Sequence, residues 1–358
     1  MRFCLRTSLF PLPSAPSKNV SAESHGAIPE IDFEAMNTPQ FLQDKLAVMS
    51  CDGCGESCFY PASDDVDRSV TVYGGLLFLG RSRPDSQPLF SNRTNPAQQL
   101  NGRDFGFGVQ TGFEIGGLHR GFLGDVDLEV RYFSTDDMDD FEFESFSGGV
   151  VRIHNALPFD LVGPRRVFAD YVSELRSIEA NLRYRCGGED DWLTVLAGLR
   201  YISLDESLVG VLVDPAAVAV NQQMSVAVDN RLFGIQIGMD ALLAGDRQHS
   251  IEAYGRAGIY HGDSDTVSRQ TTFTMPAVGF GASGRDGQTS SVCEIGLKAK
   301  YRLAENLEFF GRYQATWIND VALASNQLTA TNLMTGSVGP ANANVIYHGV
   351  VFGLEYAF

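Results

Sequence analysis

Three features that mark common protein classes are scarce or missing in this sequence. Lysine and arginine total 27 against 44 aspartate and glutamate residues, a net charge of −17. A basic surface for nucleic-acid phosphates is therefore not expected. No run of about 18 or more apolar residues occurs, which excludes a transmembrane helix. Long apolar stripes at helical spacing are also scarce, so a helical bundle is not expected.

Motifs of catalysis and cofactor binding are missing as well. The sequence has no G-x-S-x-G, H-E-x-x-H or Walker motif. The glycines of "GFGVQTG" at 106–112 alternate within an expected strand and precede no helix, unlike those of a dinucleotide-binding loop. We therefore predict no enzyme activity, no cofactor and no catalytic or metal site.

Cysteine is uncommon, and three of the six residues, Cys51, Cys54 and Cys58, cluster in "CDGCGESC". The spacing is compatible with a metal site, a disulfide or an unpaired segment. Zinc normally takes four ligands and no histidine lies nearby, which disfavours a metal. Residues 1–22 resemble an atypical signal peptide cut after Ala22. Residues 23–68 are polar and irregular, which indicates a periplasmic linker or disordered arm.

From residue 70 onward the sequence is rich in alternation of apolar with polar or small residues, the pattern of β-strands. Each alternating segment is about 10–13 residues long, as a tilted membrane-crossing strand requires. The ten segments are 70–79, 103–114, 121–133, 175–185, 192–203, 229–241, 250–261, 291–303, 306–318 and 346–358.

The connections between these segments alternate in length. They contain 23, 6, 41, 6, 25, 8, 29, 2 and 27 residues in chain order. Outer-membrane barrels have short periplasmic turns and long outer loops. We therefore predict an all-β fold for residues 69–358: a transmembrane antiparallel up-and-down barrel of about ten strands. The segment 141–153 is typical of an extra hairpin around Gly148 and Gly149, which either extends the sheet outside the membrane or makes the barrel twelve-stranded.

The end of the chain, "YHGVVFGLEYAF", resembles the C-terminal signal of bacterial outer-membrane proteins. The matching positions are Val350, Phe352, Leu354, Tyr356 and Phe358. The resemblance implies that the barrel-insertion machinery recognises this strand. "VYGGLLFLGRSRPDSQPLF", "VDNRLFGIQIGMDALL" and "IEAYGRAGIYHG" also resemble the porin-like barrels of planctomycete-type bacteria, and this resemblance implies a pore-forming protein.

The alternation also predicts which side chains line the lumen. Both charge signs occur there, so the lumen is either a water-filled channel for small polar solutes or ions, or a narrow barrel plugged by its own ion pairs. The lumen-lining candidates are Asp127, Glu129, Arg131, Glu179, Arg183, Arg185, Arg200, Glu252, Arg256, Glu294, Lys298, Lys300, Arg302, Glu308, Arg312 and Glu355.

We therefore expect a porin-like barrel in the bacterial outer membrane, in contact with lipid and passing small polar solutes or ions. The alternative is a plugged structural barrel whose acidic outer loops, above all "STDDMDDFEFES" at 134–145, bind a surface partner. The third alternative is an outer-membrane hydrolase. Its only candidate group at the outer rim is His261 with Asp263 and Asp265.

Overall fold

The computed structural model describes residues 69–358 except 156, 158–159, 187–191, 217–218 and 274–276. The predicted signal peptide, the linker and the cluster of Cys51, Cys54 and Cys58 lie outside the described residues. Within the described part of the chain, no helix is long and apolar enough to cross a membrane.

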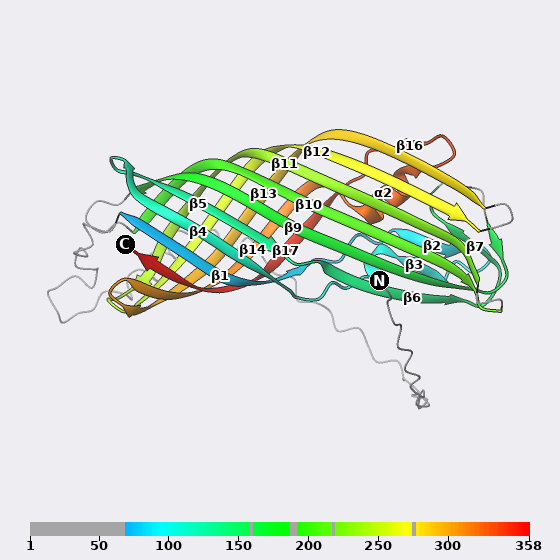
Figure 1. Cartoon of the computed structure of the whole chain (residues 1–358), viewed down its shortest axis with the longest axis horizontal. Helices are drawn as coiled ribbons and strands as arrows, with labels where there is room; N and C mark the ends of the chain where they lie inside the picture. The colour runs from blue at the N-terminus through cyan, green and yellow to red at the C-terminus, as the bar shows by residue number, and fades with distance from the viewer. Residues whose placement is uncertain (1–68, 156, 158–159, 187–191, 217–218, 274–276) are drawn as a thin grey trace, which may run out of the picture. The chain divides into compact units, whose positions relative to one another are not determined.

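Ten antiparallel strands form a closed ring in the described part of the chain (Figure 1). The largest sheet has eleven strands, of which β6 flanks the ring, and the ring closes because β9 pairs with both β5 and β10. The ring strands, in order, are β1 (Val70–Arg81), β4 (Gln110–Leu123), β5 (Val126–Thr135), β9 (Arg165–Cys186), β10 (Leu193–Asp214), β11 (Ala219–Gly245), β12 (His249–Thr272), β13 (Val278–Ala304), β14 (Leu307–Ala322) and β17 (Asn342–Ala357).

The first and last strands are neighbours. β1 pairs with β17 from Thr71 opposite Ala357 to Arg81 opposite Tyr347. Residues 69 and 358 therefore lie at one end of the barrel, together with the short turns at 124–125, 246–248 and 305–306. The predicted up-and-down barrel of ten strands is confirmed.

Strand β6 (Met138–Phe146) decides between ten and twelve strands. It continues the direction of β5 and pairs with the N-terminal part of β9, from Met138 opposite Ser173 to Phe146 opposite Arg165. The expected hairpin at 141–153 does not form within the barrel wall, because β7 (Val150–Ile153) joins another sheet. That small sheet has the order β3 (Gln99–Asn101), β2 (Pro88–Asn92), β7 and β8 (Leu161–Val162).

A belt of exposed apolar side chains surrounds the half of the barrel that carries the short turns. Lipid can contact such a face because a closed sheet leaves no backbone group unpaired. The belt therefore marks the membrane-spanning part of each strand. Its members include Val72, Leu76, Ile115, Val130, Ile178, Leu182, Leu199, Tyr201, Phe233, Ile235, Ile237, Ile259, Ile295, Leu297, Phe309, Tyr313, Phe352 and Leu354.

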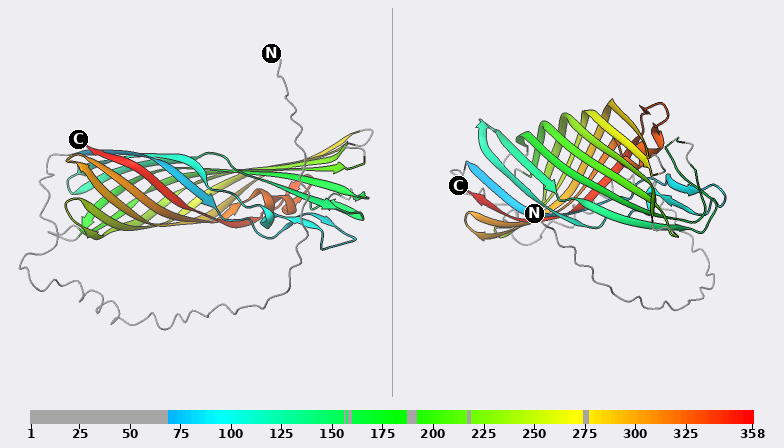
Figure 2. Two further views of the ribbon diagram at one scale, coloured as in Figure 1. Left: turned by 90° about the horizontal axis from the view of Figure 1, so that it is seen from below. Right: turned by 45° about the vertical axis from the view of Figure 1, so that its right-hand side comes forward.

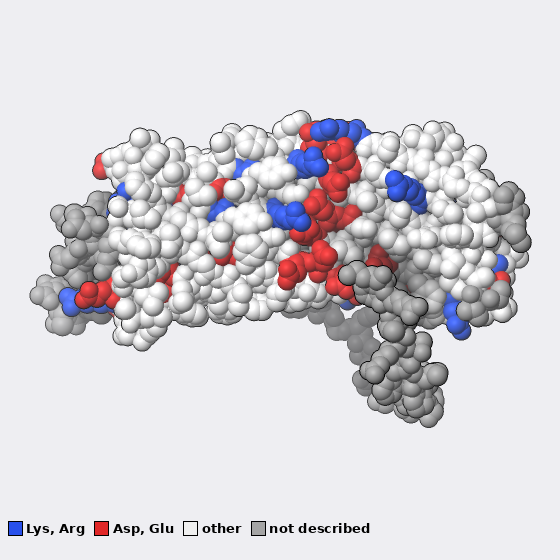
Figure 3. Space-filling view, in the orientation of Figure 1, with Lys and Arg blue, Asp and Glu red and all other residues white. Residues whose placement is uncertain are grey.

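Charged residues on the outer surface follow directly above this belt. Figure 3 shows them as a band across the middle of the barrel, with largely uncharged surface on both sides. Glu174, Asp205, Asp229 and Asp265 stand opposite one another on successive strands, and Arg285 follows on β13. This row places the boundary between the membrane-spanning half and the outer half.

The strands extend much further beyond the boundary than predicted. β9 to β13 have 22, 22, 27, 24 and 27 residues. They occupy most of the segments expected as outer loops at 204–228 and 262–290, and β9 also takes up 165–174 of the segment expected as a loop at 134–174. The neighbouring strands β14, β17, β1 and β4 are shorter, with 16, 16, 12 and 14 residues. The outer half is therefore a half-open shell of long strands (Figure 2).

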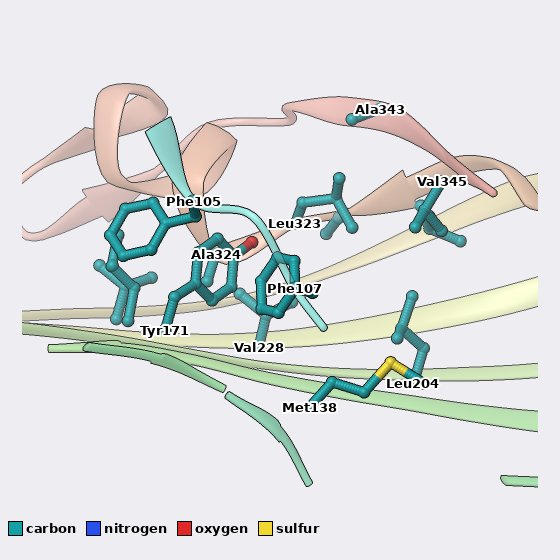
Figure 4. Packing of buried hydrophobic residues seen from close by; sticks show 14 of the residues in the cluster. Phe105, Phe107, Met138, Tyr171, Leu204, Val228, Leu323, Ala324, Ala343 and Val345 are labelled. Carbon is teal, nitrogen blue, oxygen red and sulfur yellow. The ribbon is translucent and has the colours of Figure 1, made fainter. Parts of the chain in front are cut away.

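Two inserted segments fill this shell. One, residues 82–109, contains β2, β3 and the short helix η2 (Gly102–Asp104). The other, residues 323–341, contains α2 (Ala324–Ala330), β15 (Thr331–Asn332) and β16 (Ser337–Val338). We call these two segments the outer plug. Figure 4 shows Phe105 and Phe107 of the first segment and Leu323 and Ala324 of the second packed against the strands.

The predicted strand at 103–114 is wrong for its first half. Phe105 and Phe107 are 0% and 8% exposed and belong to the outer plug, whereas β4 begins at Gln110. Their alternation with Gly106 and Gly108 imitates a strand. Their rings, however, pack on Tyr171 at 5.4 and 5.2 Å between centroids and do not face lipid.

Candidate functional site

Inside the membrane-spanning half, charged side chains from all sides of the ring meet in one buried cluster. It contains four carboxylates and four guanidinium groups, so it is electrically balanced. We call it the lumen network, and its members are Glu114, Glu129, Glu179, Glu294, Arg131, Arg200, Arg256 and Arg312.

Arg131 of β5 lies at the centre of the lumen network. Its Nε donates to Oε2 of Glu114 at 3.0 Å, and its Nη1 donates to Glu294 at 2.8 Å and to Glu179 at 3.2 Å. Its Nη2 donates to Oε1 of Gln314 at 2.8 Å. These partners come from β4, β13, β9 and β14, so a single side chain connects four strands across the lumen.

The remaining guanidinium groups complete the network. Arg200 Nη1 donates to Glu294 Oε2 at 2.9 Å, Arg256 pairs with Glu179, and Arg312 pairs with Glu114. Arg131 is 1% exposed, and Glu114 and Glu294 are fully buried. Charges so far from water are tolerated because each faces opposite charge at hydrogen-bond distance. The lumen at this level is therefore filled with paired side chains.

Glycines on the inner face make room for bulky neighbours. A Cβ added to Gly353 would lie 2.7 Å from Cζ of Phe310, and one added to Gly234 would lie 2.8 Å from Cδ1 of Tyr260. Both distances are shorter than a van der Waals contact. These glycines therefore do not widen the lumen, because aromatic rings and the backbone of the neighbouring strand occupy the space that they leave.

Below the lumen network, the lumen opens towards the end with the short turns. A cavity of about 290 Å³ there is bordered by Arg183, Asp240, Glu252, Lys300 and Glu355, and by Trp192 at its mouth. We call it the vestibule. Its charges are paired too: Arg183 Nη2 lies 2.6 Å from Asp240, and Lys300 Nζ lies 3.5 Å from Glu355.

The outer plug makes a second closure above the lumen network. Its anchor is Arg81, at the outer end of β1, whose Nη2 lies 2.6 Å from Oε1 of Glu206 on β10. The Arg81 guanidinium also covers the ring of Phe107, 4.4 Å from the ring centroid. Glu206 Oε2 accepts hydrogen bonds from the Tyr171 hydroxyl at 2.6 Å and from the backbone N–H of Ala324 at 2.9 Å.

Electrostatics keeps this anchor charged. Burial of Arg81 by itself would lower its pKa, but the carboxylate of Glu206 raises that pKa above its ordinary value. Burial raises the pKa of Tyr347, the cross-strand neighbour of Arg81, to about 12. Arg81 therefore stays a cation and Tyr347 stays neutral at every physiological pH.

All sixteen residues predicted to line the lumen form ion pairs with inward-facing partners. Glu129, Arg131, Glu179, Arg200, Arg256, Glu294 and Arg312 belong to the lumen network. The other nine, which lie nearer the turns, are Asp127, Arg183, Arg185, Glu252, Lys298, Lys300, Arg302, Glu308 and Glu355.

Several important residues were not predicted. Glu114 follows Gly112 by two positions and so shares its face, a signal that was available in the sequence. Asp240 lies two residues after Gly238 in the same way. Arg81 and Glu206 fall in segments that the sequence predicts to be loops, so no inward or outward direction is predicted for their side chains.

The positions expected to form the C-terminal signal share the lipid-facing side of β17. Phe352, Leu354, Tyr356 and Phe358 are exposed, and Val350 is half-buried. Recognition by the insertion machinery stays a prediction. His261 is exposed on the outer surface of β12. Asp263 and Asp265 pair with Arg285 at 2.9 and 3.8 Å, and no contact with His261 is seen in the described part of the chain.

A closed antiparallel ring with an apolar outer belt and a charged interior defines a transmembrane β-barrel. The chain belongs to the family described as "Putative beta barrel porin-7", whose sequence profile matches residues 163–358. No curated protein matches the chain. The planctomycete-type resemblance stays a prediction.

Solved structures of outer-membrane barrels are similar to this chain. The outer membrane protease OmpT from Escherichia coli has 8% identity and a TM-score of 0.46, with 81% of this chain and 97% of OmpT covered. The toluene transporter TodX from P. putida has 9% identity and a TM-score of 0.26, with 84% and 91% covered. The COG4313 outer membrane channel from Pseudomonas putida F1 has 10% identity and a TM-score of 0.26, with 84% and 100% covered.

Proposed function

We propose that this protein is a bacterial outer-membrane barrel that is closed at rest and acts through its outer half, which binds a partner at the cell surface. The observation that carries the closed state is the central position of Arg131, which bonds to three buried carboxylates across the lumen. Interiors of barrels with few strands are readily filled by side chains. The outer plug adds a second closure in series.

Conductance in a planar bilayer tests the proposal. The wild-type barrel should give no channel steps. An inner variant, Arg131→Ser with Glu294→Ser, removes one charge of each sign from the lumen network. An outer variant replaces residues 84–107 and 324–338 by short Gly-Ser linkers. Each variant alone should remain silent because the other closure persists, and the combined variant should conduct.

Heat-dependent gel mobility serves as the folding control for every variant. Reproducible steps from the wild-type barrel would overturn the proposal. A folded combined variant without conductance would show that the lumen network and the outer plug are not what closes the barrel.

Porin-like passage of small polar solutes or ions is the second candidate. It is supported by the vestibule, a charged cavity of about 290 Å³ that reaches from the turn end towards the lumen network, and by membership in a porin family. Passage then requires both closures to move. Wild-type steps that disappear when a disulfide locks α2 to β11 would favour this candidate.

A further inference from the structure

Strand β6 forms an edge of the main sheet in the outer half. In the described part of the chain it pairs with β9 on one side, and its other side ends the sheet. At the Asp140 end, the backbone N–H of Gly106 donates to Oδ2 of Asp140 at 2.7 Å. The remaining length of the edge, 141–146, offers backbone groups to which a further strand can pair.

The outward face of this edge carries aromatic side chains outside the membrane. Phe141 and Phe143 are 58% and 45% exposed. Both lie against Phe168 of β9, with centroid distances of 6.2 and 5.1 Å. They follow β5 beyond the boundary between the two halves, so the lipid of the apolar belt does not cover them. Clustered exposed aromatic rings are typical of an interaction surface.

The other face of β6 carries Asp140, Glu142 and Glu144. No ion pair involves these three carboxylates in the described part of the chain, whereas every predicted lumen charge is paired. Burial, Asp140 and Asp104 raise the pKa of Glu142, and the backbone N–H of Phe143 and the guanidinium of Arg83 lower it by less. Negative charge therefore exceeds positive charge along this edge.

This charge pattern discriminates between possible occupants. A second copy of β6 would place carboxylates opposite carboxylates, and directly opposed like charges destabilise a strand pair. Inward charges on an edge normally prevent such self-pairing. The same charges favour an incoming strand with lysine or arginine on the corresponding face. The exposed rings of Phe141 and Phe143 favour apolar residues on its other face.

We propose that β6 is a docking edge for an extended segment of a partner protein, in which basic residues alternate with apolar or aromatic residues. The segment adds to the sheet beside β6 as a further strand, a common mode of peptide recognition. Its basic side chains face Asp140, Glu142 and Glu144, and its apolar side chains cover Phe141 and Phe143. The inference rests on the proposed role of the outer half and names the chemistry of its partner.

The test uses a labelled nine-residue peptide with alternating lysine and valine, and the full-length protein in nanodiscs of uncharged phospholipid. Fluorescence anisotropy measures binding, and empty nanodiscs provide the background. Glu142→Gln with Glu144→Gln should weaken binding about two- to thirtyfold, since each of the two opposite-charge pairs across strands contributes roughly 0.2–1 kcal/mol. The matched control, Asp205→Asn with Asp229→Asn, removes two outward carboxylates elsewhere and should change affinity less than about twofold.

Two further measurements separate strand addition from simple charge attraction. The same peptide, N-methylated at alternate residues, keeps its lysines but loses backbone donors, and it should no longer bind. Phe141→Ser with Phe143→Ser should also weaken binding. Equal affinity of the methylated peptide, or of the Glu142/Glu144 variant, would overturn the proposal.

Peptide binding and bilayer conductance, measured on the same protein, separate the docking edge from the proposed closure. Peptide binding without conductance supports both. Silent bilayers without peptide binding would overturn the inference alone, and wild-type conductance would overturn the proposed closure whatever the peptide does.

Discussion

Arg81 and Glu206 form an ion pair of 2.6 Å in which both side chains are fully buried. Arg81 belongs to the wall strand β1 and lies over Phe107 of one plug segment. Glu206 belongs to β10 and accepts the N–H of Ala324, the first residue of α2 in the other plug segment. One pair of charges therefore connects the wall to both parts of the outer plug.

We predict that Glu206→Gln destabilises the protein by about 3–5 kcal/mol, because it leaves the Arg81 cation buried without a counter-charge. Denaturant unfolding in detergent measures the loss, and limited proteolysis should cut the outer plug first. The double variant Arg81→Met with Glu206→Leu should lose much less, since it removes both charges. An equal loss in both variants would contradict this assignment.

Arg131→Met should be similarly costly, by about 3–5 kcal/mol, because Glu114, Glu179 and Glu294 would lose a shared cation. Adding Glu294→Gln should restore part of the loss. Arg285→Met serves as the control, because its side chain is 61% exposed and its ion pairs are on the surface. The measurement is the temperature at which the folded band disappears from unheated gels, and a control as damaging as Arg131→Met would contradict the prediction.

Gly353→Ala should destabilise the barrel by about 1–3 kcal/mol, since the new methyl group would overlap the backbone oxygen of Gly74 and the ring of Phe310. Gly255→Ala is the matched control. A Cβ there would meet no atom within 4 Å, although Gly255 lies in the same membrane-spanning half. The ratio of folded to unfolded protein in urea compares the two. A destabilised Gly255→Ala together with a normal Gly353→Ala would show that close packing against Gly74 and Phe310 is not the reason for the glycine.

Binding at β6 should depend on pH. The pKa of Glu142 lies above its usual value of 4.5 because of burial and the neighbouring Asp140 and Asp104. The carboxylate form therefore destabilises the fold at neutral pH, and this cost disappears as the pH falls through the raised pKa. As the pH is lowered, Glu142 becomes protonated and affinity for the lysine peptide should decrease, and this decrease should begin at a pH above 4.5. The decrease should be shallower in Glu142→Gln. Identical pH profiles would exclude Glu142 as the group responsible.

The sequence predicts the membrane-spanning half well because lipid outside and charge inside produce one regular alternation. On β10, Val195, Leu199 and Tyr201 face outward. Above the boundary the apolar positions change face: Leu204 and Leu208 point inward against the outer plug. This shift by one residue interrupts the period-two pattern. A prediction that requires all apolar residues of a strand to lie on one face therefore ends each strand at the boundary and assigns the remaining residues to a loop.

The same change of face explains the missed anchor. Arg81 and Glu206 are inward-facing charges within an apolar interior, so local alternation gives no reason to pair them. Only the ring, which brings β1 and β10 to face each other, makes the partnership visible. In the membrane-spanning half, by contrast, the alternation of apolar and polar positions is enough to predict that Arg131, Glu179 and Glu294 point inward.

The unequal strand lengths also bear on how the barrel assembles. β9 to β13 pair as long hairpins between neighbours in the chain, and such local pairs form with little loss of loop entropy. The seam between β1 and β17 joins the first and the last strand of the barrel. These strands pair over a shorter length than β9 to β13 do, and Gly75 lies opposite Gly353 within this pairing. Long local hairpins would thus come first, and the seam would close the ring last. The seam is therefore the place where a half-assembled barrel remains open to lipid or to the machinery that inserts it.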